Sequence, residues 1–160
     1  MDLGLKDRVA LVSGSARGIG KAIAKVLLQE GCSVVICDID EEKLAKTESE
    51  LSNYGNVLAV PTDVTDMGDV KRLVNTAVEK FGTIDILINN VGILGGETPF
   101  HELSLDDWEA VYDVNIKGTV RVTKEVLPYM RKQGWGRIIN IASEAASQTI
   151  LSPTTTPQRR

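Results

Sequence analysis

Five short runs of apolar residues recur along the chain, and most of them show little alternation with polar residues. These runs are rich in β-branched side chains, which is typical of strands buried on both faces of a parallel sheet. They span residues 9–12, 34–37, 57–60, 86–88 and 138–141. The pattern therefore predicts five strands that lie inside the molecule.

The segments between these runs carry helical spacing. The clearest is 70–81, where apolar residues step by three and four and form one stripe. Asp66 precedes this stripe as a candidate N-terminal cap, and Gly82 follows it as a stop. Residues 104–132 predict one long helix with a capping-box-like start, bent where Pro128 interrupts it.

Strand and helix alternate strictly, which favours βαβ units and an open α/β architecture. We expect a doubly wound parallel sheet of five strands with four helices on its two faces, forming one domain over residues 1–143. The segment 144–160 holds two prolines and four threonines and shows neither a helical nor a strand period. It is predicted to be a disordered tail.

Composition narrows the classes of partner. The 160 residues carry a formal net charge of −4 and no basic cluster, so there is no electrostatic reason to expect nucleic acid or an anionic membrane as a partner. No apolar run approaches a bilayer span, and the N-terminus lacks a signal-peptide pattern, which predicts a soluble, cytoplasmic protein. Cys32 and Cys37 read as small core residues, and the lone His101 gives no reason to expect a metal site.

A glycine-rich turn follows the first predicted strand. Gly14, Gly18 and Gly20 enclose a short strand-to-helix connection, where missing Cβ atoms let the backbone approach a pyrophosphate at the helix N-terminus. Tight packing of the turn without any ligand is the plain alternative. A nucleoside-triphosphate loop fits less well, because it would need glycine in place of Ser15 and a hydroxyl residue in place of Ala22.

An acidic residue closes the second predicted strand. Asp38 lies 18 residues after Gly20, close to the spacing of the acid that accepts hydrogen bonds from the ribose of a dinucleotide. A carboxylate there repels a 2′-phosphate, so NAD is favoured over NADP, although Arg17 could offset part of that repulsion. Asp38 or Asp40 could instead cap the next helix, and Asp40 is the better placed of the two.

From about residue 6 to residue 143 the sequence resembles the short-chain dehydrogenase/reductase family. The glycine turn, with Ser13 in place of the usual threonine, the pair Asp63-Val64, and Asn89 to Gly92 with valine in place of alanine all match its motifs. Asn115 matches the helix asparagine of the family's catalytic tetrad, and Ser143 matches its serine. The resemblance implies a Rossmann-type sheet that lacks the family's C-terminal strands and helices. Within the family, the sequence is most similar to β-ketoacyl-acyl-carrier-protein reductases and related dehydrogenases, and its motifs do not distinguish between these subgroups.

The resemblance also implies a set of site residues. Asn115 and Ser143 are the candidate catalytic residues. The candidate cofactor-binding residues are Gly14, Ser15, Arg17, Gly18, Ile19, Gly20, Asp38, Asp63, Val64, Asn90, Val91 and Gly92. From the residues alone, Asn89 and Asn90 could equally satisfy backbone groups at a strand end. An asparagine inside a helix beside Lys117 and Gly118 predicts a local distortion at Asn115 that holds a water or a main-chain carbonyl.

One part of the family's catalytic apparatus has no counterpart in the sequence. Members of the short-chain dehydrogenase/reductase family transfer a hydride between a nicotinamide and a secondary alcohol or ketone. In this family a Tyr-x-x-x-Lys pair carries out the proton transfer. No such pair occurs among the 160 residues. Three hypotheses stay open: an NAD(H)-dependent oxidoreductase whose turnover is impaired in this chain, a non-catalytic dinucleotide-binding remnant, and a partner of longer relatives or a homo-oligomer formed through the helix 104–132.

Overall fold

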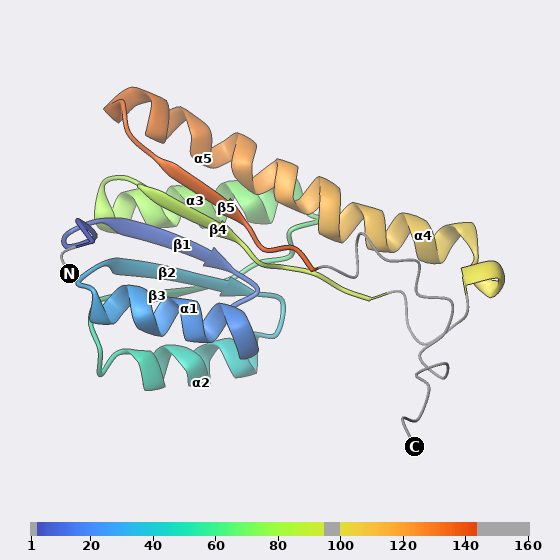
Figure 1. Ribbon diagram of the computed structural model, residues 1–160, viewed down its shortest axis with the longest axis horizontal. Helices are drawn as coiled ribbons and strands as arrows, with labels where there is room; N and C mark the ends of the chain where they lie inside the picture. The colour runs from blue at the N-terminus through green and yellow to red at the C-terminus, as the bar shows by residue number, and fades with distance from the viewer. Residues whose placement is uncertain (1–2, 95–99, 144–160) are drawn as a thin grey trace, which may run out of the picture.

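The computed structural model describes residues 3–94 and 100–143 of the chain. The predicted disordered tail, 144–160, lies outside the described residues. All five predicted strands are present and pair in parallel in the order β3-β2-β1-β4-β5 (Figure 1). Their bounds are β1 Val9–Ser13, β2 Ser33–Asp38, β3 Val57–Pro61, β4 Ile86–Asn89 and β5 Arg137–Asn140.

The four predicted helices are also confirmed. The first three are α1 Gly18–Gln29, α2 Glu41–Leu51 and α3 Met67–Phe81. Asp66 caps α3 by accepting hydrogen bonds from the backbone N–H groups of Gly68 and Asp69, and Gly82 ends it in the left-handed conformation at φ 84°. Both ends of this helix therefore follow the prediction.

The fourth helix is long and continuous, but it is not α-helical throughout. It consists of α4 Leu105–Tyr112, a π-helical segment η2 Asp113–Gly118, and α5 Thr119–Gln133, preceded by the short 3-10 turn η1 Phe100–Glu102. The sequence predicts a bend near Pro128 and a local distortion at Asn115, and the π-helical geometry occurs at the second of these positions, in η2. Pro128 lies on the exposed side of α5, where water can take over the hydrogen bond that a proline cannot make.

Helices cover both faces of the sheet and create two separate cores. α1 and α2 lie on one face, while α3 and α5 lie on the other (Figure 1). Leu11, Val35 and Leu87 point into the core under α3 and α5, and their strand neighbours Val12, Val34 and Ile88 point into the core under α1 and α2. This explains why β1, β2 and β4 read as unbroken apolar runs, since their apolar positions are buried on one face or the other.

The edge strand β5 is an exception to this burial. All four of its residues are exposed, although it pairs fully with β4. Within the described residues, no strand pairs with the outer edge of β5.

Candidate functional site

The candidate site lies where the carboxyl ends of the strands meet. Along the chain, β1, β2 and β3 build outward in one direction and β4 and β5 in the other, so the connections diverge between β1 and β4. Open α/β sheets bind ligands at this point. A cleft of about 440 Å³ opens there, lined by Gly14, Arg17, Ile19, Asp38, Ile39, Thr62, Asp63, Val64, Asn90, Val91, Gly92, Ile93 and Val114.

The glycine turn has the geometry of a backbone cradle. Gly14 and Gly18 adopt φ of 61° and 57°, a left-handed conformation that other residues take only with strain. A Cβ on Gly18 would meet no atom within 4 Å, so its backbone faces open space. A Cβ on Gly20 would lie 2.3 Å from the carbonyl oxygen of Gly14, so this residue lets the helix sit directly on the turn.

The N-terminus of α1 differs from those of the other long helices. Asp40 caps α2, Asp66 caps α3 and Ser104 caps α4, and each of these helices has an acidic residue in its first turn. α1 has neither a side-chain cap nor an acidic residue there. The first N–H groups of α1 therefore receive no side-chain cap, and its first turn carries no negative charge, which suits an anion.

Two polar side chains join the glycine turn to the end of β4. The Ser13 hydroxyl oxygen accepts from the backbone N–H of Asn90 at 3.0 Å. The side-chain amide of Asn90 donates to the carbonyl oxygens of Ser13 at 3.1 Å and Gly14 at 2.9 Å. Asn90 thus does satisfy backbone groups at a strand end, and by doing so it holds the turn in place at the mouth of the cleft.

Asp38 lies at the opposite side of the turn. Its carboxylate accepts from the N–H of Ala16 at 3.1 Å and from that of Asp40 at 3.2 Å, which orients it at the cleft wall. Asp40 makes the helix cap, accepting from the Lys43 N–H at 3.0 Å, as its position predicted. Asp38 therefore does not cap α2, and its carboxylate remains at the cleft wall.

Ser15 and Cys37 are buried beneath the turn. The Ser15 hydroxyl donates to the carbonyl oxygen of Val12 at 2.8 Å and accepts from the N–H of Cys37 at 3.0 Å, and its side chain does not reach the cleft. Burial, reinforced by the Asp38 carboxylate, raises the pKa of the Cys37 thiol to about 12. These residues support the turn from below.

Asp63 and Val64 form a third wall of the cleft. The Asp63 carboxylate accepts from the backbone N–H and the hydroxyl of Thr65 at 2.8 and 2.7 Å. Val64 is buried against the long helix, where a Cβ on Gly118 would approach its side chain to 2.7 Å. Gly118 therefore lets the helix lie close to this wall.

Asn115 lies in η2 and holds the strand-end segment that follows β4. Its side-chain amide donates to the carbonyl oxygen of Ile93 at 2.9 Å, and its carbonyl accepts from the N–H of the same residue at 2.8 Å. The expected distortion and the expected main-chain carbonyl are thus both present. The Arg121 guanidinium donates to the Asp113 carboxylate at the start of the π-helical segment. This hydrogen bond, together with Lys117, holds the pKa of Asp113 below the ordinary aspartate value.

A second cleft of about 730 Å³ adjoins the first and shares Val91, Gly92 and Ile93 with it. Asn115 and Ser143, the two candidate catalytic residues, both line this second cleft. Its other lining residues are mostly apolar side chains of the long helix and of the chain after β5. The two clefts thus form neighbouring spaces on either side of the segment from Val91 to Ile93.

The structure brings most of the candidate residues together. Of the candidate cofactor residues, only Ser15, Gly18 and Gly20 do not line the first cleft, Ser15 and Gly20 because they support the turn. Ile39, Thr62, Ile93 and Val114 line it and were not predicted. Each is adjacent in the sequence to a candidate site residue, and this adjacency is the only sequence signal that could have indicated it. Among the described residues, no three His, Cys, Asp or Glu side chains gather as a metal site.

Comparison with known proteins agrees with this geometry. The short chain dehydrogenase family profile matches residues 8–154. An uncharacterized oxidoreductase of Staphylococcus aureus strain USA300 is 40% identical over 150 residues, covering 94% of this chain and 64% of that relative. The uncharacterized oxidoreductase YvrD of Bacillus subtilis strain 168 is 38% identical over 157 residues, covering 98% of this chain and 58% of YvrD.

Solved structures show the same relationship. An NAD+-bound xylitol dehydrogenase superposes with a TM-score of 0.87 at 34% identity, over 90% of this chain and 56% of that one. A short chain dehydrogenase from Mycobacterium smegmatis gives 0.87 at 38% identity, over 92% and 63%. The chain belongs to the short chain dehydrogenase family of oxidoreductases, and it spans about 64% or less of the length of these relatives. No helix in the described part of the chain is long and apolar enough to cross a membrane.

Proposed function

We propose that the first cleft binds NAD(H), and that the protein acts as an oxidoreductase interconverting a secondary alcohol and a ketone. The observation that carries this proposal is the uncapped N-terminus of α1, which lies beside the left-handed Gly14 and Gly18 and opposite the oriented carboxylate of Asp38. The residues present fit a dinucleotide, because the turn offers N–H groups to a pyrophosphate and the carboxylate offers acceptors to ribose hydroxyls.

Each wall of the cleft has a role in this proposal. Asp63 and Val64 would hold the adenine, and Asn90 to Gly92 would lie along the nicotinamide ribose. When bound, the nicotinamide supplies or accepts a hydride. Ser143 would orient the substrate oxygen, while Asn115 positions the chain after β4 through Ile93.

Asp38 favours NAD over NADP in this proposal. Its carboxylate and the neighbouring Ile39 line the cleft, and Arg17 is the cationic side chain lining the described cleft. A 2′-phosphate placed beside Asp38 would be repelled, since like charges in a partly buried site interact strongly. The NAD+ in the related xylitol dehydrogenase supports the same choice. We propose the cytoplasm as the location, in keeping with two free, buried cysteines.

The proton-transfer group is the missing part. The 160 residues contain no Tyr-x-x-x-Lys pair, and loss of a general acid or base typically lowers a rate by about 10²- to 10⁴-fold. We therefore propose that this chain binds the cofactor but turns it over slowly.

Titration of the purified chain with NADH, with NADPH and with ADP-ribose tests the proposal. Saturable binding of NADH is expected, with ADP-ribose within about tenfold of it, because the adenosine and pyrophosphate contacts lie within this chain. Asp38→Ala should weaken NADH binding and narrow its preference over NADPH. Glu79→Ala, which removes a carboxylate from the exposed side of α3, is the matched control and should bind like the parent. Failure of the folded chain to bind any of the three ligands would contradict the proposal.

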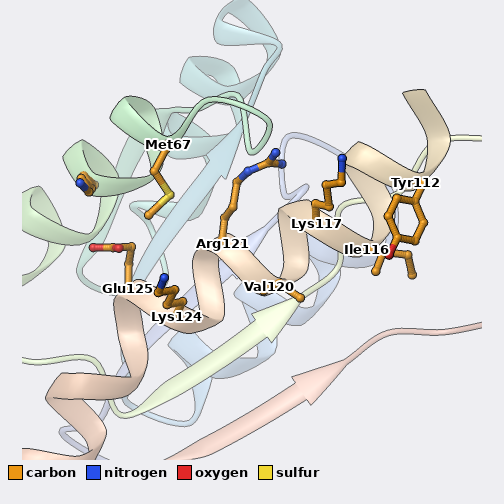
Figure 2. A pocket seen from close by; sticks show the side chains of 9 residues that line it. Met67, Tyr112, Ile116, Lys117, Val120, Arg121, Lys124 and Glu125 are labelled. Carbon is orange, nitrogen blue, oxygen red and sulfur yellow. The ribbon is translucent and has the colours of Figure 1, made fainter. Parts of the chain in front are cut away.

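A second candidate function is association through the long helix, with a second copy or with longer relatives. Trp108, Tyr112, Ile116 and Val120 repeat every fourth residue and are 43% to 57% exposed. Tyr112, Ile116 and Val120 border a groove of about 660 Å³ between this helix and the start of α3, and Arg121 and Lys117 rise from the same stretch of helix (Figure 2). An apolar stripe of this kind fits a helical partner.

The oligomeric state tests this second candidate. If the stripe is an interface, Ile116→Asp should weaken self-association by about tenfold or more, because a carboxylate would be buried without a partner. Glu109→Asp changes the same helix without altering its charge, and it should leave self-association unchanged. Sedimentation of both variants over a range of concentrations gives the answer, and equal behaviour would remove the candidate.

A further inference from the structure

A threonine inside α2 occupies a position where an apolar side chain would be expected. Leu44, Thr47 and Leu51 form the buried stripe of this helix, at steps of three and four residues. Thr47 is only 2% exposed, and threonine is among the weaker helix formers. A buried hydroxyl needs a hydrogen-bond partner, so the partner of Thr47 shows what this residue contributes.

The partner lies in the glycine turn rather than in α2. A threonine inside a helix commonly donates to a carbonyl one turn back in the same helix. The Thr47 hydroxyl instead donates to the carbonyl oxygen of Ala16 at 2.7 Å, across 31 positions of the chain. Ala16 is itself buried, so water cannot readily replace this donor.

Ala16 is held at both of its backbone groups. Its N–H donates to the Asp38 carboxylate at 3.1 Å, and its carbonyl accepts from Thr47. The preceding residue is held as well, because the N–H of Ser15 donates to the carbonyl of Cys37 at 3.1 Å. The end of β2 and the middle of α2 therefore fix this part of the turn from two sides.

The contact with Thr47 also sets the direction of the next N–H group. The peptide bonds of the described residues are trans, so the N–H of Arg17 points opposite to the carbonyl of Ala16. Because that carbonyl is directed at α2, the Arg17 N–H is directed away from α2. No described residue accepts from this N–H, and Arg17 lines the first cleft. The group is therefore available to an oxygen of a ligand.

α2 is anchored independently of this hydroxyl. Leu51 is buried in the core beneath the helix. The Glu48 carboxylate accepts from the N–H of Ala59 on β3 at 2.7 Å, and Glu50 pairs with Lys21 of α1 at 2.6 Å. Removal of the hydroxyl should therefore leave α2 in place and loosen the turn.

We propose that Thr47 is a positioning residue for the dinucleotide: by holding the Ala16 carbonyl, it directs the Arg17 N–H at an oxygen of the adenosine half. The inference rests on the proposed cofactor site, and it adds a residue that does not line the cleft. The adenosine half is the relevant part, because the same Ala16 donates to Asp38, the proposed ribose acceptor. Thr47 acts on the cofactor only through this stretch of backbone.

Removal of the hydroxyl at nearly constant side-chain shape tests this role. Thr47→Val removes the donor, so the Kd for NADH should rise by about fivefold, as expected for the loss of one hydrogen bond. Thr47→Ser retains the hydroxyl and should bind NADH within about twofold of the parent. Leu51→Val trims the same buried stripe at the end of α2, and it should lower stability without changing the Kd.

Two further readouts separate positioning from a general loss of stability. In the isotope-labelled chain without ligand, Thr47→Val should move the amide resonances of Ala16 and Arg17, whereas Leu51→Val should not. In an Asp38→Ala background, Thr47→Val should weaken NADH binding less than it does in the parent. The two effects are coupled because both side chains hold the backbone of one residue.

The outcomes distinguish this inference from the proposed function. If the parent chain binds neither NADH, NADPH nor ADP-ribose, the proposed function fails and this inference fails with it. Saturable binding by the parent together with unchanged binding by Thr47→Val would overturn the role of Thr47 alone. A loss of binding that Thr47→Ser does not restore would also overturn it, because the shape of the side chain rather than its hydroxyl would then matter.

Discussion

Three glycines share the turn after β1, and two different physical reasons require them. Gly14 and Gly18 have left-handed backbones, whereas Gly20 has an ordinary helical backbone but no room for a Cβ. The motif spacing predicts that all three positions require glycine. It does not reveal that Gly20 packs against Gly14 and Asn90, because Asn90 comes 70 residues later in the chain.

Alanine substitution should separate these reasons. Gly20→Ala is expected to lower the free energy of unfolding by about 3 kcal/mol, because a backbone oxygen stands 2.3 Å from the new Cβ and the turn must shift. Gly18→Ala should cost only about 1 kcal/mol, the strain of a left-handed alanine, while still weakening NADH binding. Urea denaturation of both variants measures the difference, and equal losses would contradict this account.

The π-helical segment shows how one element serves the site from a distance. η2 lets the long helix present Asn115 toward Ile93 while Gly118 lies against Val64. Poor helix formers in this stretch predict a distortion, and the structure confirms it. The partner, Ile93, was not predictable, because it follows a different strand and carries no polar side chain of its own.

Asn115→Ala should therefore have a local and measurable effect. Loss of both hydrogen bonds to Ile93 is expected to lower the free energy of unfolding by about 1–3 kcal/mol. Hydrogen exchange at the Ile93 amide should become faster. Asn53→Ala removes an amide that donates to the Glu50 carbonyl on the exposed end of α2, and it should cost less than about 0.5 kcal/mol. A variant as stable as the parent, with slow exchange at Ile93, would rule out this role.

At the level of the molecule, the sheet holds the cleft that we propose for the dinucleotide, while the residues of its fifth strand are exposed within the described part of the chain. Binding and turnover are therefore expected to separate. The cleft depends on β1 to β4 and the helices around them, all of which pack into the two cores. In the proposed function, proton transfer depends on a Tyr-x-x-x-Lys pair, which does not occur among the 160 residues.

Steady-state assays should show this separation directly. With a panel of ketones, NADH oxidation by the 160-residue chain is expected to stay close to that of a Gly14→Ala, Gly18→Ala double variant, because the missing acid costs about 10²- to 10⁴-fold. NADH binding by the parent chain should nevertheless be retained. Oxidation well above the double variant would show that another group transfers the proton.

The order of strands and helices, the glycine turn and the acid at the end of β2 follow from the sequence because they depend on local spacing. Periods of two and of 3.6 residues, caps and turn residues act within a few positions of one another. The tertiary structure was needed to show that Asn90 braces the turn, that Asn115 holds Ile93, and that the Glu48 carboxylate accepts from the backbone N–H of Ala59 on β3. These are contacts between residues far apart in the chain, and local periodicity carries no information about which distant atoms the packed sheet and helices bring together.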